Sequence, residues 1–401
     1  MSNYIPSVIL IQIFYQLPVK SLIRFRLVSK EWKSLIDSSE FKSDYIICQL
    51  AQRKRILLRV YRGYVDDDHE REEYCWIVDD DETFPQHKIS FKYPWSVNRL
   101  KNMKQDSKLV GCSHGLLCFT GEDDDCFNCY IIWNPSIKKS VTIDSPNYRW
   151  AIAVTSGFGV CPNSLDPKIV KINTFDVPYD YDYDYDNDFL CTHRAWRVEV
   201  FTLSAGVWRS PLTKLPNKWY NINLESQTPV VLNGFIYWSA YVGRMFIDCN
   251  TIISFNLESE EFTKLKLPSE LARLNGDREL DLFKLRESLG VVQSEFEGSK
   301  EVHKVWLMDY NSKSFNKLFN LTLPEMWDVI GFRDNEQLII KMIDERFKYS
   351  EKRVVSGLVA HEPNSKHFNY LGLNVGCSSF TSSYIESLLL LDQYGTMNDD
   401  G

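Results

Sequence analysis

Residues 5–41 read IPSVILIQIFYQLPVKSLIRFRLVSKEWKSLIDSSEF. The apolar residues in the first half of this stretch are Ile9, Leu10, Ile13, Phe14 and Leu17. Because they recur at intervals of three and four residues, they predict one buried face of an α-helix. Pro6 suits the first turn of a helix, and Pro18 prevents the helix from continuing. The first helix is therefore expected to end near Gln16.

Two further short helices are expected in the second half of the stretch. Their apolar residues are Val19, Leu22, Ile23 and Phe25, followed by Trp32, Leu35 and Ile36. Ser29 is a good N-cap residue for the last of these helices. A module of three short helices has a very small interior, which cannot hold every apolar residue. The apolar residues that do not fit in this interior are among Ile5, Leu10, Leu17, Leu22 and Val28. This surplus apolar surface predicts a permanent partner.

The stretch resembles an F-box. The resemblance rests on Ile5-Pro6, on Ile13-Phe14 and on the dense match LPVKSLIRFRLVSKEWKSLI at 17–36. It implies a module that docks on the small adaptor linking substrate receptors to a cullin–RING ubiquitin ligase. The family usually has Leu-Pro followed by an acidic residue, whereas this chain has Ile-Pro-Ser-Val at 5–8. The alternative interpretation is an ordinary helical cap on the domain that follows.

The resemblance also implies which side chains contact the adaptor. They are Ile5, Pro6, Leu10, Ile13, Leu17, Pro18, Leu22, Val28 and Trp32. None of these side chains is charged, so binding of the adaptor is expected to depend little on salt.

The composition excludes several classes of protein. The chain has 401 residues, of which 44% are hydrophobic and 14% aromatic, and a formal net charge of −8. It can build a large core, and its charge gives no general attraction to nucleic acids. The sequence has no apolar run of about 18 residues and no secretory signal, so no membrane span is expected. The 10 cysteines are expected to be free thiols in the cytoplasm, the nucleus or both.

After Phe41 the sequence changes to short strand-like runs separated by turn residues, and these runs repeat. Each repeat has a strand-like run, a polar turn, and an apolar or aromatic residue that opens a return strand. The repeats lie at 74–84, 131–141, 198–208, 252–262, 305–315 and 358–368. Their starting positions are 53 to 67 residues apart, a spacing that indicates propeller blades rather than solenoid coils.

A further strand precedes each of these hairpins. These strands are expected at 56–61, 115–119, 168–172, 234–238, 289–292 and 338–342. Such repeats indicate a six-bladed β-propeller, or a seven-bladed one if one blade is too degenerate to detect. The last strand candidate, SYIESLLLL at 383–391, is expected to complete the N-terminal blade and to close the ring.

The expected fold is α+β with two domains, a three-helix F-box over 1–44 and an all-β propeller over 45–391, before a disordered tail over 392–401. The segments VGCSHGLLCF, IIWNPSIKKSV, VVLNGFIYWSA and IISFNLESEEFTKLKLP resemble the F-box-associated, kelch-like domain of plant F-box proteins. The chain departs from that family at His114, where Asn is usual, and at the insertion 179–188. The resemblance implies that the propeller holds a protein to be ubiquitinated.

Six connections, each just before the first strand of a hairpin, are expected on one face of the propeller. Those at 62–72, 120–129 and 175–188 are strongly acidic. They predict a negative field that docks a basic segment of the substrate. The candidate residues are Asp66, Asp67, Asp68, Asp123, Asp124, Asp125, Asp180, Tyr181, Asp182, Tyr183 and Asp184. The alternative is that these loops only keep the protein soluble.

No metal, other cofactor or catalytic site is expected. A calcium-binding loop beginning at Asp182 would need Gly and Glu where the chain has Asn187 and His193. Cys126 and Cys129 form a CxxC pair with a zinc-like spacing. The upstream candidates are Cys112, His114 and Cys118, in a strand-like context that favours buried thiols. No GxSxG motif or phosphate-binding glycine loop occurs.

The sequence therefore favours a non-catalytic substrate receptor of a cullin–RING ubiquitin ligase. Its expected partners are the adaptor, through it the cullin, and a substrate protein with a basic surface. Neither nucleic acid nor membrane is an expected partner. The alternative is a propeller-type enzyme or metal-dependent binding protein that carries an F-box. Polar ligands converging on the central channel would indicate that alternative.

Overall fold

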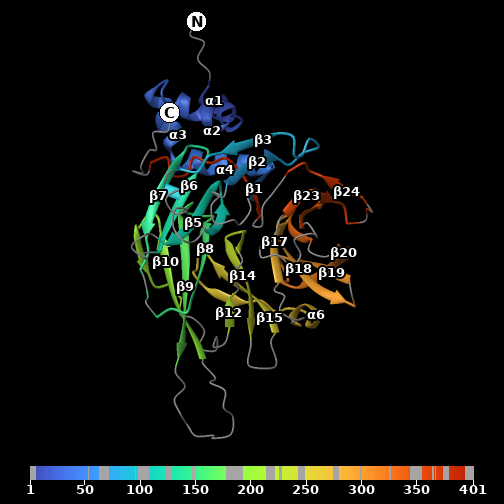
Figure 1. Cartoon of the computed structure of the whole chain (residues 1–401). Coiled ribbons are helices and arrows are strands. Elements are labelled where there is room, and N and C mark those ends of the chain that lie inside the picture. The colour runs from blue at the N-terminus through green and yellow to red at the C-terminus, as the bar shows by residue number, and fades with distance from the viewer. Residues whose placement is uncertain are drawn as a thin grey trace. The chain divides into compact units, whose positions relative to one another are not determined.

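The computed structural model places four helices in the N-terminal part of the chain and mainly strands in the remainder (Figure 1). It describes residues 6–52, 54–62, 72–94, 96–97, 108–122, 128–146, 148, 150–177, 193–213, 222–224, 228–242, 249–273, 280–298, 300–324, 327–343, 355–363, 365, 367–373 and 379–392. The chain forms two compact units. One comprises Met1–Ser145, Arg346–Val359 and Tyr370–Gly401, and the other comprises Pro146–Glu345 and Ala360–Asn369.

Four helices form a helical module, residues 6–52, at the start of the first unit. They are α1 (Ser7–Tyr15), α2 (Val19–Phe25), α3 (Lys30–Asp37) and α4 (Ser39–Gln52). The first three confirm the sequence prediction: α1 ends just before Gln16, and the Ser29 hydroxyl accepts a hydrogen bond from the Trp32 backbone N–H at 3.1 Å.

The prediction of only three helices is wrong, because α4 follows α3 after a single residue. The hydroxyl of Ser38 accepts a hydrogen bond from the backbone N–H of Phe41 at 3.2 Å, as an N-cap does. Phe41 and Tyr45 lie one turn apart on α4 and are both buried in the module. The predicted domain boundary after residue 44 therefore lies inside a helix.

Six sheets follow the helical module. The first contains β1 (Arg55–Arg62), β2 (Glu72–Asp79), β3 (Lys88–Phe91) and β25 (Ser379–Tyr384). The second contains β4 (Lys108–Ser113), β5 (Leu116–Glu122), β6 (Asn128–Asn134) and β7 (Lys139–Asp144). The third contains β8 (Ala153–Val160), β9 (Pro167–Val177), β10 (His193–Thr202) and β11 (Val207–Arg209).

The fourth sheet contains β12 (Ile222–Leu224), β13 (Val230–Leu232), β14 (Phe235–Val242), β15 (Cys249–Asn256) and β16 (Phe262–Lys264), and is followed by the short α6 (Ser269–Ala272). The fifth contains β17 (Leu280–Leu285), β18 (Ser288–Glu297), β19 (Lys300–Met308) and β20 (Phe315–Leu323). The sixth contains β21 (Asp328–Phe332), β22 (Leu338–Ile343), β23 (Val355–His361) and β24 (Phe368–Tyr370).

These sheets are the blades of a six-bladed β-propeller. Each predicted hairpin corresponds to the last two strands of one sheet, and each predicted preceding strand to the strand before them. The first sheet has the order β25-β1-β2-β3, so the end of the chain completes the blade that its beginning starts. Arg55 of β1 pairs with Tyr384 of β25, and Val60 pairs with Ser379. The predicted closure of the ring by a C-terminal strand is confirmed.

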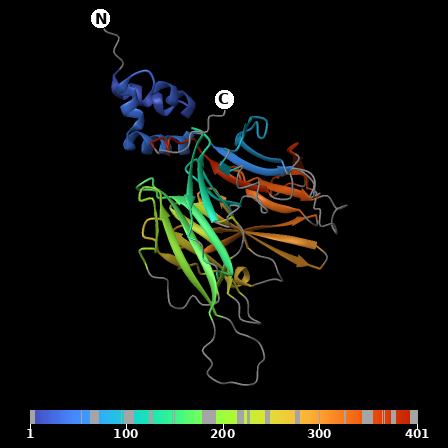
Figure 2. The ribbon, with the colours of Figure 1, turned by 60° about the vertical axis from the view of Figure 1, so that its left-hand side comes forward.

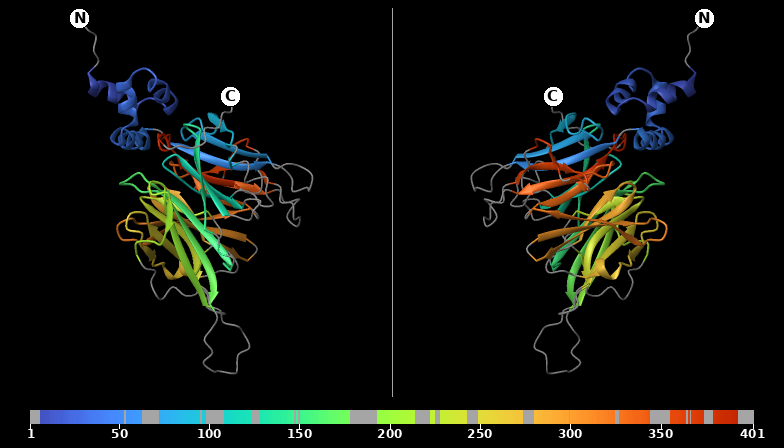
Figure 3. Two further views of the ribbon diagram at one scale, coloured as in Figure 1. Left: turned by 90° about the vertical axis from the view of Figure 1, so that its left-hand side faces the viewer. Right: turned by 90° about the vertical axis from the view of Figure 1, so that its right-hand side faces the viewer.

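The predicted position of that strand is wrong. The last strand ends at Tyr384, so most of the run predicted at 383–391 lies beyond it. We call residues 385–392 the C-terminal strap. Its Leu388 and Leu391 are buried against the helical module, and the red C-terminal segment lies beside the blue helices in Figures 2 and 3. An apolar run predicts burial, but it does not distinguish a sheet from a helix surface as the partner.

Apolar side chains from neighbouring sheets pack against each other within each unit. In the first unit, Trp133 and Phe119 of the second sheet share a buried cluster with Leu57 of the first. In the second unit, Trp238 lies in a cluster of the third and fourth sheets, and Trp306 in a cluster of the fourth and fifth. The strand tryptophans therefore stabilise the propeller core.

Candidate functional site

The interior of the helical module is built around the aromatic ring of Phe14. This ring lies 5.2 Å from the ring of Trp32 in an edge-on arrangement and 5.6 Å from that of Phe25. The buried residues around it are Val19, Leu22, Ile36, Phe41 and Tyr45, together with Leu388 and Leu391 of the C-terminal strap. The core of the module therefore uses residues from both ends of the chain.

Polar side chains of α4 hold the corner between α1 and α2. The hydroxyl of Tyr45 donates a hydrogen bond to the carbonyl oxygen of Leu17 at 2.8 Å, and Gln49 Nε2 donates to that of Tyr15 at 3.2 Å. The Tyr15 hydroxyl donates to Asp44 at 2.9 Å. Burial and this carboxylate raise the pKa of Tyr15 to about 12, so the hydroxyl remains a donor at neutral pH.

A second set of contacts holds the turn between α2 and α3. Arg26 forms two parallel hydrogen bonds to the carboxylate of Asp37, at 2.6 and 2.8 Å. Such bidentate pairs fix geometry as well as contributing energy. Ser29 caps α3 directly after the turn. Leu27 and Val28 thus lie on a turn that is braced at both ends.

Seven large apolar side chains of the module are exposed, although its core is closed. Two of them, Ile47 and Leu50, lie on α4. The other five are Val8, Ile9, Ile13, Leu27 and Val28, and their exposed fractions range from 44% to 87%. Three come from α1 and two from the braced turn between α2 and α3. Clusters of exposed apolar residues are a mark of interaction sites. We call these five residues the apolar surface.

Two family models match this chain. Residues 4–44 match a model described as an F-box domain, and residues 78–346, more than half of the chain, match one described as an F-box associated beta propeller domain. This chain belongs to the F-box-associated β-propeller family. The matching description gives no support to the kelch-like part of the sequence expectation.

Two plant proteins named as F-box proteins agree with this assignment. An F-box protein of Arabidopsis thaliana is 25% identical over 272 residues, which are 65% of this chain and 58% of that protein's length. The F-box protein CPR1 of the same plant is 23% identical over 419 residues, with 98% of this chain and 91% of CPR1 covered. Among solved structures, TolB from Acinetobacter baumannii has a TM-score of 0.42 at 10% identity and covers 86% of this chain and 73% of TolB.

The structure divides the predicted adaptor-binding residues of the F-box into three groups. Pro6, Ile13 and Val28 are exposed, and Ile5 lies outside the described residues. The partly buried residues are Leu10, Leu17, Pro18 and Trp32. Leu22 is 0% exposed, so its assignment to the adaptor interface is corrected: it belongs to the F-box core.

Three residues of the apolar surface were missed by the sequence prediction, namely Val8, Ile9 and Leu27. Ile9 and Ile13 were assigned to the buried face of α1, yet Phe14 is the buried residue of this helix. Helical spacing groups side chains on one face, but it does not show which of two apolar faces points inward. The sequence did indicate an exposed apolar surface, because it has more apolar residues than the small interior can hold.

The predicted substrate-binding residues of the propeller lie outside the described residues. This holds for Asp66, Asp67, Asp68, Asp123, Asp124, Asp125, Asp180, Tyr181, Asp182, Tyr183 and Asp184. The segments that carry them have equivalent places in the chain, because they join β1 to β2, β5 to β6 and β9 to β10. Each of these is the connection between the second and third strands of its sheet, as the repeat register predicted.

The cysteines considered for zinc are part of the second sheet. Cys112, Cys118 and Cys129 are buried, and Cys126 lies outside the described residues. Burial raises the pKa of Cys112 to about 12 and also raises that of Cys118, whereas metals bind the thiolate. Within the described part of the chain, no group of three or more His, Cys, Asp or Glu side chains is placed to hold a metal. No helix described there is long and apolar enough to cross a membrane.

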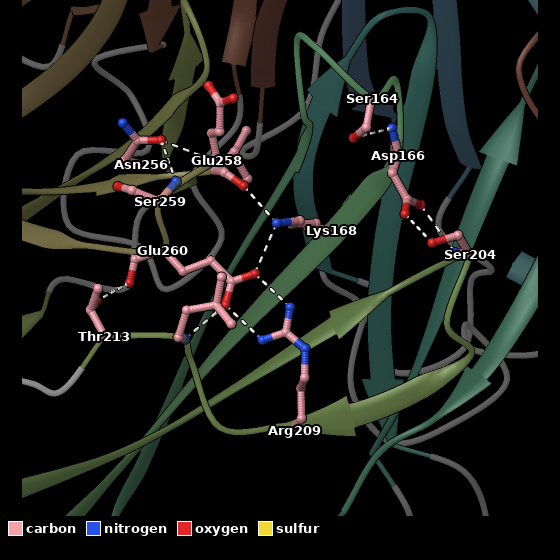
Figure 4. Close-up of polar contacts among 12 residues, drawn as sticks. Ser164, Asp166, Lys168, Ser204, Arg209, Thr213, Asn256, Glu258, Ser259 and Glu260 are labelled. Atoms are coloured by element: carbon pink, nitrogen blue, oxygen red, sulfur yellow. Dashed lines mark hydrogen bonds and ion pairs between the residues drawn. The ribbon is translucent and has the colours of Figure 1, made fainter. Parts of the chain in front are cut away.

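The second unit buries a charged cluster centred on Glu260, shown in Figure 4. Glu260 accepts hydrogen bonds from Lys168 at 2.8 Å, from Arg209 at 2.6 Å and from the backbone N–H of Leu212 at 3.0 Å. Burial alone would raise the pKa of Glu260, but the bonds from Arg209 and Lys168 outweigh it and lower the pKa to about 2. This fully paired carboxylate cross-links the third and fourth sheets.

Proposed function

We propose that this chain is the substrate-recognition subunit of a cullin–RING ubiquitin ligase. The F-box binds a Skp1-type adaptor, and through it the cullin, while the propeller binds the protein to be ubiquitinated. The chain performs no bond chemistry in this role. It raises the rate of ubiquitin transfer by holding the lysines of the substrate near the conjugating enzyme.

The observation that carries this proposal is the apolar surface of the F-box. Ile13 on α1 and Val28 on the turn after α2 are large, exposed apolar side chains on a module whose interior is already filled. The bonds that brace α1 and the turn hold these side chains in place in the free chain. A preformed apolar surface loses little conformational entropy on binding, which favours a stable complex.

Replacing both Ile13→Asp and Val28→Asp tests the adaptor interface. Both residues are exposed, so the folded chain should tolerate the change. Each buried apolar contact contributes about 1–3 kcal/mol, so the double variant should weaken adaptor binding at least 30-fold. The measurement is calorimetric titration of the full chain with purified Skp1-type adaptor.

The matched control is Leu318→Asp, the same kind of change at an exposed apolar residue of the second unit. This variant should bind the adaptor like the unaltered chain. Leu17→Ala with Pro18→Ala is a less specific test, because Leu17 packs against the F-box core. Equal affinities of the Ile13/Val28 double variant and the unaltered chain would contradict the proposed role of the apolar surface.

The double variant also provides a way to find the substrate. A chain that cannot join the ligase still has its propeller, so its bound target should escape ubiquitination and accumulate. We propose that the chain binds its substrate in the cytoplasm, the nucleus or both. The measurement is affinity capture of the full-length double variant from plant cells, compared with the unaltered chain under proteasome inhibition.

A further inference from the structure

The C-terminal strap is bound to the F-box by apolar and polar contacts. Leu388 and Leu391 complete the cluster around Phe14. The carboxylate of Glu386 accepts a hydrogen bond from the backbone N–H of Val19 at 2.7 Å, at the start of α2. Lys42 of α4 forms an ion pair with Asp392. The strap therefore contributes to the F-box interior and also fixes the beginning of α2.

The opposite side of the strap is bound to the propeller. The side-chain amide of Asn134, at the end of β6, donates hydrogen bonds to the carbonyl oxygens of Ser387 and Leu389 at 3.0 and 2.8 Å. Asn134 is fully buried, so losing these partners would leave buried donors unsatisfied. Lys139 Nζ donates to the carbonyl oxygen of Leu391 at 2.7 Å.

Glu386 connects the two sides directly. One of its carboxylate oxygens accepts from Val19, and the other accepts from Arg55 of β1 at 2.9 Å. Arg55 also binds Asp79 of β2 at 3.0 Å. Arg55 pairs with Tyr384 of β25 in the strand register. The pairing that closes the propeller and the contact that fixes α2 therefore lie two residues apart on one short segment.

We propose that the C-terminal strap couples closure of the propeller to adaptor binding by the F-box. The strap reaches the F-box from the end of β25, so the pairing of β25 with β1 fixes the position from which the strap starts. An F-box core this small depends on each of its buried side chains. Coupling between two sites is reciprocal, so adaptor binding also stabilises the pairing of β25 with β1. The effect of adaptor binding on the pairing of β25 with β1 rests on the proposed function.

Gly115 offers a way to disturb the strap from the propeller side. It follows β4 with a positive φ of 77°, and a Cβ atom at this position would collide with the backbone carbonyl oxygen of Ile385. Gly206 also has a positive φ, of 67°, but no atom lies near the position of its Cβ. Gly115→Ala and Gly206→Ala therefore share the backbone strain of alanine at positive φ, and only the first displaces the strap.

Hydrogen exchange of the full chain without adaptor tests whether the strap links the propeller to the F-box. Amide exchange reports the free energy of local opening. Gly115→Ala should speed exchange in α1 and α2 about tenfold, although the substitution lies in the turn between β4 and β5 of the second sheet. Gly206→Ala should leave exchange in α1 and α2 unchanged. Equal exchange of these helices in Gly115→Ala and the unaltered chain would overturn the coupling.

Adding purified Skp1-type adaptor to the unaltered chain tests whether adaptor binding stabilises the pairing of β25 with β1, and this test needs no variant. Exchange of β25 and β1 amides should slow about tenfold, while that of β15 in the second unit should not change. Binding without slower exchange in β25 and β1 would overturn the coupling while leaving the proposed function intact. Absence of adaptor binding would overturn the proposed function, and the variant comparison would still decide whether the strap links the F-box to the propeller.

Discussion

At the scale of single residues, Glu260 shows how a buried charge stabilises a β-propeller. Its side chain is inaccessible to solvent and accepts hydrogen bonds from two cations on the neighbouring sheet, Lys168 and Arg209. A buried ion pair is costly to disrupt, because removal of one partner leaves the other buried and uncompensated. Loss of the carboxylate therefore destabilises the fold mainly because it leaves the two cations without their anionic partner, and less because the attraction itself is lost.

Glu260→Gln should lower the free energy of unfolding by about 3 kcal/mol at neutral pH. The folded pKa of about 2 lies below the ordinary value of 4.5. The charged form thus stabilises the fold above pH 4.5, and this contribution is lost as the pH falls toward 2. The gap between the melting temperatures of variant and parent should narrow over that interval. Glu258→Gln, two residues away and exposed, should change neither the free energy of unfolding nor the melting temperature. A difference between the melting temperatures of Glu260→Gln and the parent that stays constant with pH would contradict the stabilising role of the Glu260 carboxylate.

The turn at His114 shows how one unusual residue fits a repeated structure. His114 and Gly115 have φ values of 50° and 77°, and Asn233 and Gly234 have 49° and 77° at the corresponding turn of the fourth sheet. Asn and His adopt such angles more often than most other side chains do. The departure from the family pattern at His114 thus changes the residue but keeps the turn.

At the scale of elements, β25 and the C-terminal strap have separate roles that truncation should distinguish. A chain that ends at Tyr384 keeps the four-stranded first sheet and loses the strap together with residues 393–401, so it should remain soluble with a loosened F-box. A chain that ends before Ser379 exposes the edge of β1 and should aggregate. Size-exclusion chromatography of the two truncated chains checks this. Equal monomer yields would show that β25 is dispensable for solubility.

The elements that the sequence predicted are those whose pattern is local. The hairpins repeat in register, and Pro18 and Ser29 mark helix ends, so their positions follow from neighbouring residues. The strap and the outward orientation of Ile9 depend on contacts distant in sequence. Leu388 is buried by residues more than three hundred positions earlier, such as Phe14. No local pattern carries that information, because an apolar residue has the same spacing whichever surface covers it.

At the scale of the whole molecule, the remaining prediction concerns charge. The formal net charge is −8, and three of the six connections between second and third strands are strongly acidic. If these residues guide the substrate to the propeller, the substrate has a surface rich in Lys or Arg. Exposed charges act over a screening length of about 8 Å at physiological ionic strength. Binding of the substrate should therefore weaken as salt rises, whereas the apolar adaptor contact should not.

Two triple variants separate guidance from simple solubility. One replaces Asp123, Asp124 and Asp125 with Asn, and the other replaces Asp180, Asp182 and Asp184 with Asn. Electrostatic steering changes the rate of encounter more than the lifetime of a complex. Each variant should therefore slow association with a captured substrate severalfold at low salt and change dissociation little, and the difference should fade at high salt. Equal association rates in all three proteins at low salt would show that the carboxylates only solvate the surface, and the substrate-binding site would then lie elsewhere on the propeller.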